Sequence, residues 1–156
     1  MKPLPFPYPL NIGTDIVHLP RILRLITSAT KEGSSKLDRF TRRILCEQEQ
    51  RDFRSRFHLS TRAGPCLSTV TPTPDMARWL AGRFAAKEAA RKASTRGAGA
   101  IGWKDVLVSV EDTGTLGSGR PQVIYLDAKT EGNARIGKLS ISHDGEYVVA
   151  TVLAAE

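Results

Sequence analysis

The sequence predicts an α+β domain in which helices pack on one side of a mostly antiparallel sheet. Three observations favour this fold class: an alternating segment follows residue 10, apolar stripes of helical spacing fill the middle of the chain, and β-rich segments separated by turn sequences end it. At 156 residues the chain is long enough for one core and too short for two independent domains. We expect one domain over residues 11–156, preceded by a proline-rich N-terminal extension over residues 1–10.

The first strand is predicted directly after this extension, over the segment NIGTDIV at residues 11–17. Apolar and polar residues alternate there, and Pro20 suits the first turn of a following helix. Strands are depleted in aspartate, so Asp15 in the middle of this one should either face water or bind a ligand.

Two longer helices are predicted in the middle of the chain. Residues 36–57 form a basic amphipathic pattern that we interpret as one helix, and residues 76–94 form a second, with Asp75 as its N-cap and glycines after its end. Residues 58–75 are rich in serine, threonine and proline and show no periodicity. We interpret them as a long surface loop inserted between the helices.

The last third of the chain predicts antiparallel strands. DVLVSVE at 105–111 and PQVIYLD at 121–127 flank a glycine-rich turn, and KLSISH at 138–143 and EYVVATVLA at 146–154 flank the tight-turn pair Asp144-Gly145. A short helix is expected over residues 128–136.

The composition limits the partners. A net charge of +7 favours an acidic one: nucleic acid, an anionic membrane, an acidic protein or a phosphorylated small molecule. Aromatic residues make up only 6% of the chain and form no evident stacking platform for single strands, and no apolar run reaches the ~20 residues that span a bilayer. We therefore expect neither nucleic acid nor membrane as the partner.

The two cysteines, Cys46 and Cys66, form neither a disulfide framework nor a metal-ligand pattern, which favours a reducing compartment. The start of the chain resembles neither a signal peptide nor an arginine-rich transit peptide. We expect a cytoplasmic protein, with a mitochondrial location left open for a eukaryotic source.

Glu88 is the single acidic residue of the segment RFAAKEAARKAS, and it continues an apolar stripe that runs through Leu80 and Phe84. A carboxylate that enters a partly buried position needs a compensating charge. Two interpretations stay open: an ion pair with Lys92 one turn later, or a divalent cation shared with Asp15. Two carboxylates with room for water and phosphate suit Mg²⁺. The surrounding cations either bind phosphate oxygens or form a solvated face; they are Arg83, Lys87, Arg91 and Lys92.

Three segments, in order and at similar spacing, resemble the holo-acyl-carrier-protein synthases, the small class of 4′-phosphopantetheinyl transferases. They are IGTDIVHLPRI at 12–22, RFAAKEA at 83–89 and SISHD at 140–144, and the resemblance extends over roughly residues 11–154. It implies an enzyme of lipid metabolism that moves the 4′-phosphopantetheine arm of coenzyme A to a serine of apo-acyl carrier protein and releases adenosine 3′,5′-bisphosphate.

The resemblance also implies roles for individual residues. Asp15 and Glu88 would bind Mg²⁺, Lys92 would lie near the phosphates, and Glu88 would have a second role in deprotonating the serine. Coenzyme A would contact Arg83, Lys92, Ser142 and His143, although a structural hydrogen-bonding role for His143 stays open. Arg21, with Arg24 nearby, would meet the acidic carrier protein.

The family is typically trimeric with sites at subunit interfaces, so a homotrimer is expected. Two alternatives remain at this point: a basic RNA-binding module, and a Mg²⁺-dependent phosphohydrolase that uses the same Asp15 and Glu88 pair.

Overall fold

The computed structural model describes residues 3–27, 35–59, 67, 70–111, 119–126 and 134–155. Its centre is a five-stranded antiparallel sheet with the strand order β1-β5-β4-β3-β2. The strands are β1 Leu10–His18, β2 Val106–Val110, β3 Pro121–Tyr125, β4 Arg135–Asp144 and β5 Tyr147–Ala155. The predicted sheet is confirmed.

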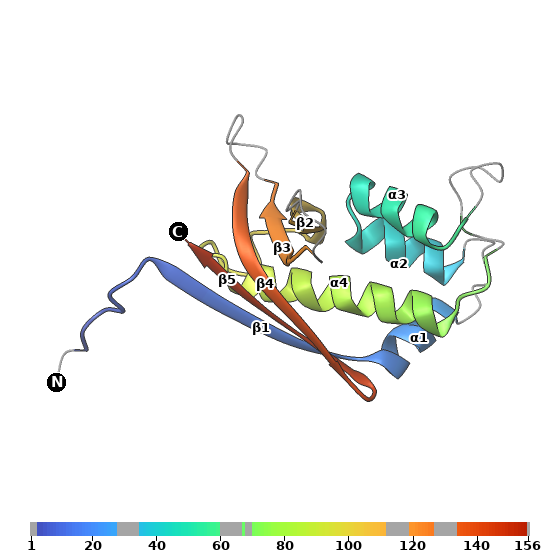
Figure 1. Ribbon diagram of the computed structural model, residues 1–156, viewed down its shortest axis with the longest axis horizontal. Coiled ribbons are helices and arrows are strands. Elements are labelled where there is room, and N and C mark those ends of the chain that lie inside the picture. Colours follow the sequence, from blue (N-terminus) through green and yellow to red (C-terminus); the bar gives the residue numbers. More distant parts are fainter. Residues whose placement is uncertain are drawn as a thin grey trace.

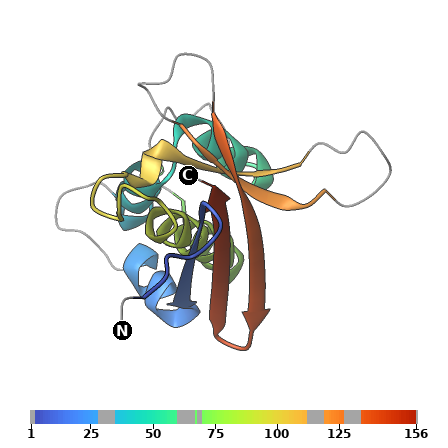
Figure 2. The same ribbon diagram turned by 90° about the vertical axis from the view of Figure 1, so that its left-hand side faces the viewer.

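The helices gather on one face of this sheet, as the two ribbon views show (Figures 1 and 2). They are α1 Leu19–Thr27, α2 Lys36–Ile44, α3 Glu47–Arg56 and α4 Pro74–Lys92, with a short 3₁₀ turn, η2, at Trp103–Asp105. The longest, α4, runs along β1 and β5 (Figure 1). Among the described residues, no helix combines the length and the apolar character needed to cross a membrane.

The packing of α4 on the sheet depends on small residues. Its buried side includes six alanines, which let the helix approach the strands closely; they are Ala77, Ala81, Ala85, Ala86, Ala89 and Ala90. On β1, Gly13 makes the same approach possible, because a Cβ at this position would lie only 2.0 Å from the carbonyl oxygen of Ala89. The glycine thus brings β1 against the last turns of α4.

The strand register sorts side chains between the two faces of the sheet. Asp15 pairs with Ala150, which pairs with Ile141, and Val17 pairs with Val148, which pairs with His143. Directly opposite residues in antiparallel strands share a face. Val17, Val148 and Ala150 are buried, so this is the face that α4 covers.

The middle of the chain differs from the prediction of one helix over residues 36–57. The helix is interrupted at Leu45 and Cys46, whose backbones are extended. A second helix, α3, begins after them. The backbone N–H of Cys46 donates to the Glu49 side chain at 3.0 Å. The apolar residues of the pattern lie mainly in α2, whereas α3 is dominated by polar and charged residues and buries only Phe53 as an apolar side chain, so periodicity did not reveal the break.

Three boundaries also need correction. The N-cap of α4 is Thr73, whose hydroxyl accepts from Met76 N–H at 3.2 Å, and Asp75 lies inside the first turn. The loop between β4 and β5 consists of Gly145 and Glu146, one residue later than expected, with Gly145 at φ +52°. Arg135 and Ile136 belong to β4 rather than to a short helix; residues 128–133 lie outside the described part.

The insertion predicted at 58–75 stays a prediction over half of its length, and its last two residues belong to α4. Residues 60–66, 68 and 69 lie outside the described residues, and so does the turn at 112–118 between β2 and β3. The described part of the N-terminal extension, residues 3–9, is exposed and leads away from the sheet (Figure 1).

Candidate active site

Asp15 lies against the end of α4, where Gly13 allows the close approach. Its Oδ1 is 2.8 Å from Nζ of Lys92, which also donates to the carbonyl oxygen of Thr14 at 2.9 Å. The Asp15 side chain is 17% exposed, so this mid-strand carboxylate neither faces open water nor is fully buried. The contact joins two residues that are 77 positions apart.

Two hydrogen-bond donors hold the carboxylate of Glu88 on α4. Arg91 Nη1 donates to Glu88 Oε1 at 2.6 Å, and the indole Nε1–H of Trp103 donates to the same oxygen. The described part of the structure therefore does not contain the predicted ion pair between Glu88 and Lys92. Lys92 pairs with Asp15 instead, and Glu88 pairs with Arg91. The Glu88 side chain is 19% exposed.

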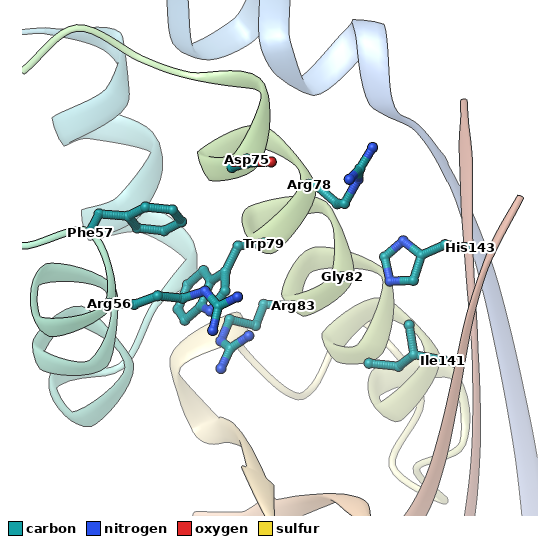
Figure 3. Close-up of a pocket in the computed structure, with 9 residues that line it drawn as sticks. All are labelled: Arg56, Phe57, Asp75, Arg78, Trp79, Gly82, Arg83, Ile141 and His143. Atoms are coloured by element: carbon teal, nitrogen blue, oxygen red, sulfur yellow. The ribbon is translucent and has the colours of Figure 1, made fainter. Parts of the chain in front are cut away.

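A cavity of about 660 Å³ lies farther along α4, toward its N-terminus, and Figure 3 shows the side chains around it. The sheet contributes Ile141 and His143 from β4, and α3 and its end contribute Arg56 and Phe57. The α4 residues are Asp75, Arg78, Trp79, Gly82 and Arg83. Three arginines against one aspartate make this cavity suited to an anion.

Arg83 is the most constrained cation of the cavity. Its guanidinium carbon lies 3.3 Å from the centre of the Trp79 ring, a stacked cation–π contact. Burial lowers the pKa of Arg83 to about 10, so it remains protonated at neutral pH. Among the described residues, its Nε is the one buried side-chain nitrogen or oxygen without a hydrogen-bond partner. A bound anion would supply that partner.

The predicted site residues thus fall into two groups. The structure brings Arg83 together with His143, and Asp15 together with Lys92. Glu88 follows Arg83 by five residues, which places it roughly 140° farther around the helix. The anion cavity and Glu88 therefore lie on different sides of α4 in one chain.

Ser142 does not join either group. It pairs with Val149, which pairs with Ile16, and these positions alternate with those that face α4. The side chain of Ser142 consequently lies on the outer face of the sheet, away from the cavity that His143 lines.

Lys87 departs from the expectation of a phosphate ligand or a solvated cation. It is fully buried and forms an ion pair with Glu49 at 2.6 Å, and both side chains have no exposure. Burial lowers the pKa of Lys87, and the Glu49 charge opposes this shift. Sequence reasoning did not identify Glu49, because its partner lies 38 residues away and no local pattern joins them.

The two predicted carboxylates suit Mg²⁺ by their chemistry, since it prefers hard oxygen donors. Within the described ranges, no group of three or more acidic, histidine or cysteine side chains could hold a metal by itself. A cation bound by Asp15 and Glu88 would take further ligands from water or substrate phosphate, as Mg²⁺ commonly does.

Other functional predictions fall elsewhere in the fold. Arg21 and Arg24 are exposed on α1, which directly follows β1. Cys46 is buried, and burial raises its thiol pKa, as befits a structural rather than a reactive cysteine. Cys66 lies outside the described residues.

Comparisons with known proteins agree on one family. The model of the 4′-phosphopantetheinyl transferase superfamily matches residues 11–152. The chain is 62% identical, over 99% of both chains, to a protein of Aspergillus fumigatus named 4′-phosphopantetheinyl transferase B, mitochondrial. It is 36% identical to a holo-[acyl-carrier-protein] synthase of Gloeobacter violaceus, over 91% of this chain and 89% of that one.

A solved structure supports the same assignment. The holo-(acyl-carrier-protein) synthase of Bacillus anthracis, in complex with CoA (3′,5′-ADP), matches with a TM-score of 0.61 and 31% identity. The match covers 94% of this chain and 96% of that one. The sequence match and the structural match both extend over nearly the whole domain, and the chain therefore belongs to the 4′-phosphopantetheinyl transferase superfamily.

Proposed function

We propose that this protein is a holo-[acyl-carrier-protein] synthase, which transfers 4′-phosphopantetheine from coenzyme A to a serine of an apo-acyl carrier protein and releases adenosine 3′,5′-bisphosphate. The observation that carries the proposal is the cationic cavity on α4, in a chain of this family. The relatives described above are transferases and holo-acyl-carrier-protein synthases, not RNA-binding proteins or phosphohydrolases.

The cavity fits the adenosine 3′-phosphate end of coenzyme A. Arg83 carries a buried Nε without a partner, and Trp79 holds its guanidinium in place by stacking. His143 approaches the same space from β4, and Arg78 from the preceding turn of α4 (Figure 3). A phosphate there would satisfy Arg83 and would be bound by charge-assisted hydrogen bonds. This arrangement supports ligand roles for Arg83 and His143, and gives no support to one for Ser142.

Asp15 and Glu88 are the residues that would hold Mg²⁺. When bound, the cation would neutralise charge on the pyrophosphate of coenzyme A. The serine oxygen forms a bond to the phosphorus that carries pantetheine, and the bond from this phosphorus to the bisphosphate leaving group breaks. Glu88 is the candidate base for the serine proton. Lys92, whose side chain is 46% exposed, is the cation for the leaving group.

The acidic carrier protein would dock on α1. Arg21 and Arg24 are exposed on this helix, and α1 begins directly after the strand that carries Asp15. A carrier that meets these arginines would have its serine close to the proposed metal site. Opposite potentials on the two proteins would speed their encounter and fix their orientation.

Two features support a homotrimer with shared sites. The cavity and Glu88 lie on different sides of α4, so one coenzyme A could bind Arg83 and His143 of one copy and Glu88 of its neighbour. The outer face of the sheet also exposes apolar residues: Ile12 is 69% exposed, Ile16 62% and Leu153 42%. A bare apolar face of this kind is typical of subunit interfaces.

We further propose a mitochondrial location in preference to the cytoplasmic one expected from the sequence. The support is the Aspergillus fumigatus relative, which is named mitochondrial and matches 99% of this chain. The match includes nearly all of the N-terminal extension, while the family model begins at residue 11.

Mass spectrometry of an apo-acyl carrier protein tests the proposed function. Incubation with coenzyme A, Mg²⁺ and this protein should add one phosphopantetheine group to the carrier and release the bisphosphate. EDTA, Glu88→Gln in the enzyme, or replacement of the carrier serine by alanine should each stop the transfer. Hydrolysis of coenzyme A with an unmodified carrier would instead identify a phosphohydrolase, and RNA binding without transfer would favour the RNA-binding module.

A further inference from the structure

Trp103 contacts two consecutive residues of α4 through different groups. Its backbone carbonyl accepts from Lys87 Nζ at 2.8 Å, and its indole N–H donates to Glu88. Lys87 also donates to the carbonyl of Val106 and pairs with the buried Glu49. The buried ion pair therefore fixes the backbone of η2, and η2 presents the indole to Glu88.

The indole ring itself is held by its neighbours. The guanidinium carbons of Arg43 and Arg91 lie 4.9 Å and 5.0 Å from its centre, and the Phe84 ring lies 6.0 Å away. Arg91 is fixed as well, because it donates to the carbonyls of Ala98 and Ile101 at 2.6 Å each. Both donors to Glu88 thus come from groups with little freedom to move.

Arg91 and Trp103 donate to the same Glu88 oxygen, Oε1. Neither of them donates to Oε2. A carboxylate held through one oxygen by two fixed donors presents its other oxygen in a defined direction, which is the arrangement that a ligating or proton-accepting carboxylate requires.

We propose that Trp103 is a positioning residue, which acts with Arg91 to orient the Glu88 carboxylate so that Oε2 faces the divalent cation and the reacting serine. The inference rests on the proposed function for the identity of the cation and the substrate. Trp103 itself touches neither. Its effect on the reaction passes through Glu88.

Trp103→Phe is the direct test, because phenylalanine keeps a ring between the two arginines and leaves the backbone contact with Lys87 intact. Only the indole donor is lost. We expect the Mg²⁺ affinity, measured by calorimetric titration with coenzyme A present, to fall about tenfold, as the loss of a hydrogen bond to a charged group predicts. The Mg²⁺ concentration for half-maximal transfer should rise in parallel, with the KM for carrier protein little changed.

Tyr125→Phe is the matched control. The Tyr125 hydroxyl donates to the carbonyl of Ala90 at 2.8 Å. This substitution therefore also removes one hydrogen bond between an aromatic side chain and α4, but that bond does not involve Glu88. It should leave Mg²⁺ binding unchanged, and both variants should melt within a few degrees of the wild type.

Two results would overturn the positioning role: wild-type Mg²⁺ affinity in Trp103→Phe, or an equal loss in Tyr125→Phe. Failure of the wild type to modify a carrier would count against the proposed function, and the calorimetric titration would still decide the role of Trp103.

Discussion

Arginines and lysines that look alike in the sequence have different functions according to where the fold places them. Lys87 is buried in an ion pair with Glu49, and Arg83 is stacked on Trp79 in the wall of the anion cavity. Arg21, by contrast, is exposed on α1. The net charge of +7 counts all of them equally, yet only cations of the exposed kind can attract an acidic protein from a distance.

Charge reversal at Arg21 tests this distinction. Arg21→Glu should raise the KM for acyl carrier protein at least tenfold and change that for coenzyme A little, because the residue lies outside the anion cavity. The effect should shrink as salt screens charges over ~8–10 Å. Steady-state kinetics across an ionic-strength series measures both constants.

Arg51→Glu supplies the control, since it changes the net charge equally on α3, where Arg51 bonds Gln48. Equal changes of both KM values, or a matching effect of Arg51→Glu, would mean that α1 does not dock the carrier.

At the level of elements, one buried ion pair connects three segments. Glu49 belongs to α3 and accepts from the backbone N–H of Cys46 and of Val108 in β2, and Lys87 belongs to α4. Three donors therefore meet the two carboxylate oxygens of Glu49 where the α2–α3 break faces the sheet. The break and the ion pair depend on each other, because the extended residues 45 and 46 turn Glu49 toward Lys87.

Removing one partner of this pair should destabilise the fold strongly. Lys87→Met leaves the Glu49 charge buried and unpaired, and we expect it to lower the free energy of unfolding by about 3–5 kcal/mol. The double variant Glu49→Gln/Lys87→Met removes both charges and should recover a large part of this loss. Urea denaturation of the wild type, of Glu49→Gln and Lys87→Met singly, and of the double variant measures the coupling. Additive losses in the double variant would refute it.

At the scale of the whole molecule, the longest helix, α4, separates the two parts of the candidate site. Glu88 and His143 belong to groups on different sides of α4, and the outer sheet face is bare and apolar. Assembly into a closed ring would cover the apolar face and could bring the cavity of one copy to the carboxylates of the next.

Mixed oligomers provide the decisive measurement. Glu88→Ala and His143→Ala should each be nearly inactive, and refolding them together should restore about a quarter of the sites by random assortment around a closed ring. Glu88→Ala mixed with Asp15→Ala should restore none, because both substitutions damage the same group. Sedimentation should show a trimer. Full activity of a monomer at nanomolar concentration would contradict the shared site.

The sequence by itself determined the strands and the fold class, and it predicted most of the residues of the candidate site. Alternation and turn residues are local properties, so the pairing of β4 with β5 could be predicted with an error of one residue at Gly145. Asp15 and Glu88 stood out because a carboxylate in a strand or an apolar stripe is unexpected. The motifs around them then indicated the family.

Only the tertiary structure decided what each of these side chains meets. Asp15 meets Lys92 77 residues away, Lys87 meets Glu49 38 residues away, and Glu88 meets Trp103 15 residues away. No periodicity encodes such separations, although the second partner of Glu88, Arg91, lies at helical spacing. Alternation along β4 puts Ser142 and His143 on opposite faces, and only the packing of α4 shows that the face with His143 is the one that lines the cavity. Local backbone preference extends over a few residues, whereas burial and charge pairing are settled by whichever segments the packed core brings together.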